Sequence, residues 1–208
     1  MLHPDTELRI VDKEVGYGVF ATEPIPKGTI TWVLDELDQV FEGRRFAGLE
    51  RKYREELERY TWVDNRGNRI LCWDFGRFMN HSCEANSFSP GGFDFEIAVR
   101  DIEVGEQLTS DYGALNIEKP LFCRCGSPAC RGVIRSGDFE AHAAAWDEQI
   151  RPAFQRLQSV EQPLWRLIHR YASVIDHLVE TPDDIPSILM HRLLDRPLAL
   201  AGGGVSGA

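Results

Sequence analysis

Three of the five cysteines in this chain of 208 residues fall within eight positions, as Cys123-x-Cys125-x4-Cys130. Thiolates at this spacing can bind a metal ion, and tetrahedral zinc takes four such ligands. The alternative is a set of unrelated thiols or a redox pair, which gives the cysteines no shared role. An odd number of cysteines favours metal ligation or free thiols over a disulfide framework.

A second polar run, Asn80-His81-Ser82-Cys83, has more than one interpretation. A cysteine near a histidine suggests a thiol nucleophile, but the members of such a pair are usually distant in sequence, which argues against it. Asn, His and Ser side chains also satisfy backbone groups locally, so a buried, hydrogen-bonded turn is the structural alternative.

Two further runs carry chemistry only in the right context. Tyr112 precedes a glycine at the end of a strand-like segment, and its hydroxyl could hold an amine in line for attack, although a tyrosine in such a place is more often structural. Gly16-Tyr17-Gly18 most often marks a turn or bulge, although glycine also allows a backbone to approach a ligand closely.

Composition predicts a globular protein with one main domain. Hydrophobic residues make up 43% of the chain, charged residues 27%, and the net charge is −10. Residues 1–116 carry 22 acidic and 13 basic side chains, which disfavours direct binding of a phosphate backbone and mildly favours a lysine-bearing partner. A solvated acidic surface that only maintains solubility is an equally good interpretation. The first residues have neither a basic start nor an apolar stretch, and no long apolar run follows, so we expect neither secretion nor membrane insertion.

The elements that must position these residues are mostly short strands joined by Gly- and Pro-rich turns. Apolar residues at spacings of three and four predict one amphipathic helix over residues 43–60. After residue 136 the pattern becomes helical, with a helix over 138–150, a new start at Pro152, a long run over 154–178 that Pro163 should kink, and a short helix over 188–194. Residues 201–208 should form a flexible tail.

Taken together, the runs around Asn80, Tyr112 and the cysteines resemble the SET-domain protein lysine methyltransferases with a post-SET zinc segment, in a compact form without a pre-SET segment. The resemblance implies a mainly β fold, in which short strands surround a pseudoknot and one helix is inserted, followed here by an α-helical C-terminal extension. The expected boundaries are 1–116 for the SET domain, 117–135 for the zinc segment, and 136–200 for the extension.

The resemblance also implies roles for single residues. Tyr112 would be the catalytic tyrosine for methyl transfer from S-adenosyl-L-methionine to the side-chain amine of a lysine in a protein. The residues implied to bind this cofactor are Tyr17, Gly18, Arg77, Asn80, His81, Leu121 and Phe122. Those implied to hold zinc are Cys83, Cys123, Cys125 and Cys130. Trp73, Phe88 and Ser110 would line the substrate channel.

One departure from the family pattern concerns the product. Ser110 stands where related enzymes usually carry Phe or Tyr, so the channel should have room for up to trimethyllysine. The same gap could instead be filled by Phe88, Phe93 or Trp73.

The expected partner is a basic, lysine-containing protein or peptide, with no direct contact to nucleic acid or membrane. A homodimer through the C-terminal helices is a further expectation. The protein should be intracellular, cytoplasmic in a bacterium and nuclear in some eukaryotic settings. The alternative function is a catalytically weak or inactive SET-fold module that recruits partners through its C-terminal helices, and a zinc-stabilised interaction domain is a third.

Overall fold

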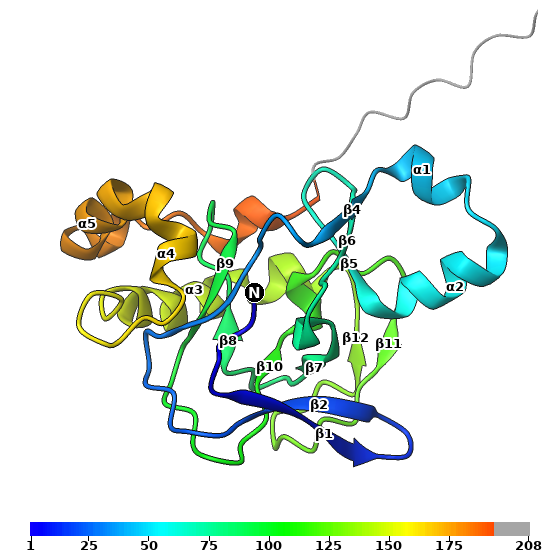
Figure 1. The fold of residues 1–208 in the computed structure, drawn as a ribbon, viewed down its shortest axis with the longest axis horizontal. Helices are drawn as coiled ribbons and strands as arrows, with labels where there is room; N and C mark the ends of the chain where they lie inside the picture. Colours follow the sequence, from blue (N-terminus) through cyan, green and yellow to red (C-terminus); the bar gives the residue numbers. More distant parts are fainter. Residues whose placement is uncertain (194–208) are drawn as a thin grey trace, which may run out of the picture.

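A computed structural model of the chain describes residues 1–193. The predicted flexible tail over 201–208 and the last residues of the predicted extension lie outside the described residues. Short strands dominate the first half of the chain, and the longest helix and most of the helical turns follow residue 137 (Figure 1). Within residues 1–193, none of the helices combines the length and the hydropathy that crossing a bilayer requires.

The N-terminal hairpin places the run Gly16-Tyr17-Gly18 at the start of a strand. Strand β1 (Thr6–Asp12) pairs antiparallel with β2 (Gly16–Ala21). Gly16 has a φ of 86°, a left-handed conformation that only glycine adopts without strain. The prediction of a turn is therefore confirmed at Gly16, while Tyr17 and Gly18 belong to the strand.

Five strands form the central sheet, in the order β3, β9, β8, β10 and β7. Their bounds are Ile30–Val33 (β3), Asn80–His81 (β7), Ser87–Phe88 (β8), Phe95–Ala98 (β9) and Thr109–Ser110 (β10). β10 lies between β7 and β8 and runs parallel to both, although it follows both in the sequence. The segment that joins β7 to β8 therefore passes around β10, which is the knotted arrangement that the resemblance implied.

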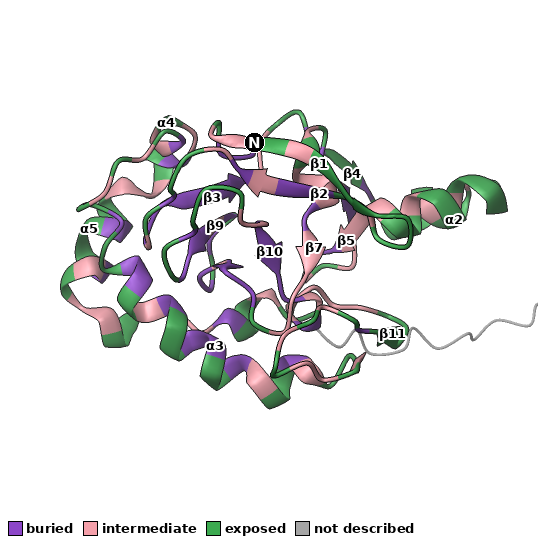
Figure 2. Ribbon diagram, turned by 90° about the horizontal axis from the view of Figure 1, so that it is seen from below, coloured by how far each residue is buried: buried purple, intermediate pink, exposed green. Residues whose placement is uncertain are grey.

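The inserted segment contains two helices where the sequence predicted one. Helix α1 (Gly43–Ala47) ends at Gly48, and α2 (Arg51–Tyr60) begins after Glu50. Neither helix buries a residue, and both extend from the side of the molecule (Figures 1 and 2). A small antiparallel sheet holds the base of the segment, made of β4 (Gln39–Phe41), β5 (Thr61–Val63) and β6 (Arg69–Leu71). Because the helix pattern lacked a core to pack on, the glycine was enough to divide it.

Four short elements complete the site region. The 3₁₀ turns η1 (Phe75–Phe78) and η2 (Tyr112–Ala114) follow an aspartate each, whose side chain accepts the N–H of Gly76 and of Gly113 respectively. Strands β11 (Leu121–Phe122) and β12 (Val133–Ile134) pair antiparallel, so the cysteine-bearing residues 123–132 form the loop of a hairpin.

The C-terminal extension is helical, as predicted, but its breaks lie elsewhere. Helix α3 (Asp138–Phe154) continues through Pro152 instead of ending before it, and residues 155–164 form turns instead of helix. The remaining elements are α4 (Trp165–Ile168), η3 (His169–Tyr171), α5 (Ala172–Glu180), η4 (Pro182–Asp184) and η5 (Ile188–His191). Gln162 explains the turns: its side chain binds the backbone of Gly28, Ile30 and Leu157, which ties this segment to the edge of the sheet.

The central sheet packs a hydrophobic core on each face. Phe95 and Ile97 of β9 point into one core, which α3 and α5 cover with Trp146, Phe154 and Ile175 among others. Trp32, Met79 and Ala98 belong to the second core on the opposite face. Alternate residues of a strand face opposite ways, so β9 contributes to both cores. The chain is thus mainly β with an inserted helical segment and a helical extension, which confirms the predicted fold class.

Candidate active site and metal site

Tyr112 lies where η2 leaves the central sheet, and its side chain is aimed at the backbone of a neighbouring segment. Its phenol donates a hydrogen bond to the carbonyl oxygen of Met79 at 2.9 Å. Burial raises the pKa of Tyr112 to about 12, so the hydroxyl keeps its proton at neutral pH. The sequence segments around Asn80 and Tyr112 therefore meet, as the resemblance implied.

Tyr112 lines a cavity of about 470 Å³. The walls come from several segments: Trp62 from the inserted segment, Ser110 from β10, Leu121 from the zinc segment and His191 from the extension. A cavity of this size accommodates an extended side chain and part of a second ligand. The extension thus contributes directly to the site, a role that the sequence gave no means of predicting.

Two of the three predicted channel residues line this cavity. Phe88 and Ser110 do so, whereas Trp73 is 40% exposed, does not line the cavity and donates its indole N–H to Asp35 at 3.1 Å. The space beside Ser110 is not simply open, because the Ser110 hydroxyl donates to the carboxylate of Glu96 at 3.1 Å. The prediction of extra room at Ser110 therefore has to take account of a charged neighbour.

A hydrogen-bonded group joins the hairpin to β7. The Asn80 amide donates to the carbonyl oxygen of Tyr17 at 2.9 Å and to the side chain of Gln107 at 2.6 Å. A Cβ atom on Gly18 would come within 2.3 Å of the Gln107 side chain, so a larger residue there would displace the Gln107 and Asn80 amides from this group. Tyr17 is 48% exposed and packs edge-on against Phe78 at 5.7 Å. These contacts bring three of the predicted cofactor residues together.

The other predicted cofactor residues are more dispersed. Arg77 lines the cavity and donates to the carbonyl oxygen of Cys72 at 3.4 Å. Leu121 also lines the cavity, while Phe122 is 88% exposed on β11. An apolar ring that is exposed at the rim of a pocket is suited to covering a flat, hydrophobic group.

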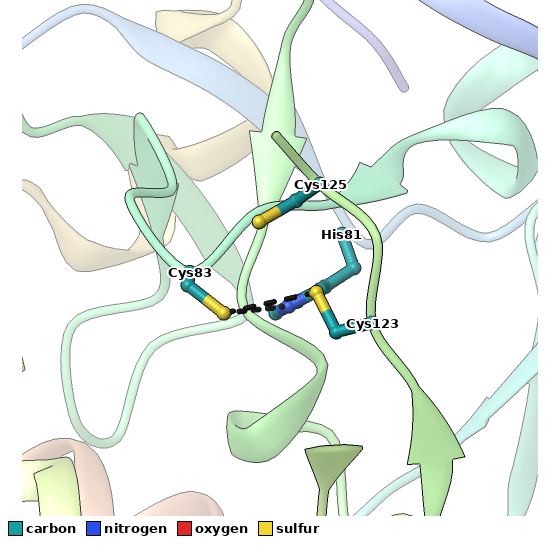
Figure 3. Close-up of side chains that lie close together, drawn as sticks. All are labelled: His81, Cys83, Cys123 and Cys125. Carbon is teal, nitrogen blue, oxygen red and sulfur yellow. Dashed lines mark hydrogen bonds between the residues drawn. The ribbon is translucent and has the colours of Figure 1, made fainter. Parts of the chain in front are cut away.

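The predicted zinc ligands are free thiols that lie close together. Figure 3 shows three of them, Cys83, Cys123 and Cys125, beside His81. The sulfur of Cys123 lies 3.8 Å from that of Cys83 and 3.6 Å from that of Cys130. Sulfur atoms at two corners of a zinc tetrahedron are about 3.8 Å apart, given a Zn–S bond of about 2.3 Å. The separations in this cluster therefore fit a zinc ion.

Cys125 belongs to the same cluster. Burial opposes its ionisation, but backbone N–H groups of Cys83 and Ser127 and the neighbouring thiols lower the pKa of Cys125 to about 7. A thiolate is therefore accessible near neutral pH, as metal ligation requires.

The structure adds His81 as a fifth candidate ligand. The ligand atoms of His81, Cys83, Cys123 and Cys125 all lie within 4.8 Å of one another, and Nε2 of His81 is 3.3 Å from the sulfur of Cys83. However, Nδ1 of His81 accepts the backbone N–H of Tyr112 at 3.1 Å. Burial lowers the pKa of His81, while Asp111 acts in the opposite direction. A neutral ring that accepts at Nδ1 carries its proton on Nε2, which argues against His81 as a metal ligand. The four cysteines stay the predicted ligand set, with His81 as the alternative to Cys130.

A buried ion pair beside the cluster was missed by the sequence reasoning. Asp111 is 2% exposed and accepts from the guanidinium of Arg131 at 2.5 Å, while Nε and the backbone N–H of Arg131 point at the Cys83 sulfur. This pair connects the residue before Tyr112 to the cysteine hairpin. The only sign of this pair in the sequence is that Asp111 is next to Tyr112 and Arg131 is next to Cys130.

Comparison with known proteins agrees with this geometry. Residues 16–113 match the SET domain family. Histone-lysine N-methyltransferase EHMT1 of Homo sapiens is 33% identical over 138 residues, which are 57% of this chain and 10% of that protein. Histone-lysine N-methyltransferase ash1 of Drosophila melanogaster is 34% identical over 138 residues, covering 61% of this chain and 6% of that protein. The chain therefore spans a tenth or less of the length of these relatives.

A solved structure with a similar fold is that of KRYPTONITE in complex with mCHH DNA, an H3(1–15) peptide and SAH. It superposes with a TM-score of 0.46 and 26% sequence identity, over 64% of this chain and 30% of that one. The sequence match, the strand order around β10 and the placement of Tyr112 agree with one another. The chain therefore contains a SET domain, which spans residues 16–113.

Proposed function

We propose that this protein transfers a methyl group from S-adenosyl-L-methionine to the side-chain amine of a lysine in a protein substrate. The single observation that carries the proposal is the buried phenol of Tyr112, held by the Met79 carbonyl at the wall of a cavity within a SET domain. The naming of EHMT1 and ash1 as histone-lysine N-methyltransferases supports the same reaction class.

The residues at the hairpin fit the cofactor. The Gln107 and Asn80 side chains lie close to the backbone at Gly18, where a Cβ would displace them, and the exposed rings of Tyr17 and Phe122 would offer apolar cover. When bound, S-adenosyl-L-methionine supplies an electrophilic methyl carbon on a positively charged sulfur. Asn80 and Arg77 are the polar side chains placed to orient it.

Tyr112 and the cavity walls would act on the amine. A neutral phenol accepts or donates one hydrogen bond, so it can fix the direction of the nitrogen lone pair without competing as a nucleophile. Trp32, Trp62 and Phe88 line the cavity with apolar surface, which excludes water from the attacking amine. Zinc on Cys83, Cys123, Cys125 and Cys130 would fix the loop of the β11–β12 hairpin beside Tyr112.

The substrate would be a basic segment of a protein, because the net charge of the chain is −10. Chain-wide acidity steers basic peptides and repels phosphate backbones at the same time, so direct nucleic-acid binding is not part of the proposal.

The test is incubation with methyl-labelled cofactor and an array of lysine-containing peptides that includes H3(1–15). The expected result is label on lysine in the wild type and a loss of label with Tyr112→Phe. A wild type that binds no S-adenosylhomocysteine in calorimetry and labels no peptide contradicts the proposal.

A further inference from the structure

Glu96 is a carboxylate inside the site that the SET-domain resemblance did not point to. It stands on β9 opposite Trp32 of β3, on the strand face turned away from the helices, and it lines the same cavity as Tyr112 and Ser110. In the sequence, Glu96 alternates with the apolar residues Phe93, Phe95 and Ile97, as a solvent-facing polar residue of a strand does. In the structure, the face of β9 that carries Glu96 packs on the second core, so Glu96 lies inside the protein.

Hydroxyl groups hold this carboxylate in place. Ser87 donates to Oε2 of Glu96 at 2.7 Å, and Ser110 donates to the same oxygen at 3.1 Å. Thr31 is hydrogen-bonded to Ser87 in turn, so the orientation of Glu96 is fixed by a chain of hydroxyls that starts in β3. A fixed, preorganised acceptor is what a reactive site requires and what a surface glutamate lacks.

Glu96 has no cationic partner within residues 1–193: its hydrogen-bond partners there are the two serines, and no Lys, Arg or His side chain pairs with it. Burial raises the pKa of the Glu96 carboxyl, with the serine hydrogen bonds acting in the opposite direction. A carboxylate in this position without a counter-ion is costly to the fold, and such groups are found preferentially where they act on a ligand.

We propose that Glu96 receives the ammonium end of the substrate lysine and takes its proton before methyl transfer. This inference rests on the proposed function. A free lysine amine has a pKa of about 10.4, so the substrate arrives protonated, and an ammonium group has no lone pair with which to attack. In the step proposed, one N–H bond of the ammonium breaks, an O–H bond forms on Glu96, and the electron pair stays on nitrogen.

Glu96 and Tyr112 then divide the work. The carboxylate selects a cationic side chain and converts it to the neutral amine, and the phenol holds that amine in line. Ser110 has a defined role in this arrangement, because its hydroxyl orients the acceptor where an aromatic side chain would displace it. Raising the pKa of a carboxyl group increases the basicity of its ionised form, which favours proton transfer from the ammonium.

The test compares Glu96→Gln with a matched surface control, Glu103→Gln, at an exposed position. We expect Glu96→Gln to lower kcat/KM on a labelled lysine peptide by about 100-fold near pH 7.5, which is the usual contribution of a general base. The pH profile separates this role from a structural one. The kcat/KM of the wild type should stop rising with pH once Glu96 is ionised. The kcat/KM of the Gln variant should keep rising about tenfold per pH unit until the lysine itself loses its proton.

A measurement without turnover gives an independent readout. The probe is an analogue of S-adenosyl-L-methionine that carries a protonated amine in place of the transferable methyl group, with S-adenosylhomocysteine as the neutral reference. In calorimetry, wild type and Glu103→Gln should bind the cationic analogue more tightly than S-adenosylhomocysteine. In Glu96→Gln, the ratio of the two dissociation constants should shrink by at least tenfold.

The outcomes are distinct. If the wild type binds neither compound, the proposed function fails and the inference falls with it. If the wild type is active but Glu96→Gln matches Glu103→Gln in rate, pH profile and analogue preference, the methyltransferase stands and the role of Glu96 is refuted.

Discussion

Among residues 1–193 the phenol of Tyr112 has one hydrogen-bond partner, the Met79 carbonyl, and burial raises its pKa to about 12. Replacing it with phenylalanine removes the hydroxyl and keeps the ring. We expect kcat to fall by about 100-fold or more, because the amine loses the group that aligns it. Steady-state kinetics on a labelled peptide measure the change, and an unaltered melting temperature shows that the fold is kept. A variant with wild-type kcat would remove Tyr112 from the mechanism.

Asp111 compensates the partly buried guanidinium of Arg131, which also approaches Asp138 at 3.4 Å. Asp111→Asn keeps the size of the side chain but leaves that cation short of its closest counter-charge. We expect a loss of about 2–4 kcal/mol in the free energy of unfolding, somewhat below the loss for a fully isolated buried pair, because Asp138 remains. Urea unfolding measures it. Asp94→Asn, at the exposed ion pair with Arg170, is the control and should change stability by less than about 1 kcal/mol.

At this scale the sequence predicted the residues that occur in recognisable runs. Tyr112, Asn80 and the cysteines each had neighbours that formed a pattern, and the structure brings those segments together. Glu96 and Arg131 had none. Their roles depend on which way a strand faces and on a contact between segments 20 residues apart, Arg131 with Asp111. Neither can be obtained from local periodicity.

The β11–β12 hairpin is the element that zinc would hold, and its ligand set can be tested. The contact of His81 Nδ1 with the Tyr112 N–H favours Cys130 over His81 as the fourth ligand. We therefore expect Cys130→Ser to lose bound zinc and His81→Gln to retain it, since glutamine can still accept the Tyr112 N–H. Elemental analysis of the purified variants measures both. Zinc lost from His81→Gln and kept by Cys130→Ser would reverse the assignment.

Chelation tests the same hairpin as a unit. Removing zinc should free residues 123–132 while leaving the two hydrophobic cores intact, because none of the cluster's sulfurs belongs to either core. Amide hydrogen exchange should accelerate in the β11–β12 hairpin and stay unchanged in β9 and α3. Exchange that accelerates equally in α3 would show that the metal supports the whole fold.

Element boundaries were predictable where a local signal acted alone. Gly16 fixed a turn, and the hydrophobic spacing placed α3 and α5 in the right regions. Pro152 did not end α3, because proline is tolerated where the rest of the turn is packed against a core, here through Ala153 and Phe154. Residues 155–164 kept helical spacing without forming a helix, since Gln162 uses backbone groups of the sheet edge instead. In each case a tertiary contact outweighed the local preference.

For the molecule as a whole, the extension is part of the SET-domain core. Its apolar side chains pack on Phe95 and Ile97 of β9 and on Phe88 of β8. These contacts bury apolar helix surface that, in the sequence, suggested packing against a second copy of the chain. The dimer stays a prediction, and light scattering at high micromolar concentration tests it.

Trp146 is the clearest place to test whether the extension and the sheet fold together. It is 4% exposed, and its ring packs against Phe88 at 5.8 Å and Phe139 at 6.0 Å, so it joins α3 to a strand that lines the cavity. We expect Trp146→Ala to cost about 3–5 kcal/mol of unfolding free energy through the cavity it leaves. Because one core contains both parts, urea unfolding should remain a single transition by fluorescence and by circular dichroism. Glu148→Ala, at an exposed position of α3, is the control and should change stability little. If the extension melted first while the sheet stayed folded, the two would be separate cooperative units, and the extension could not serve as a fixed wall of the site.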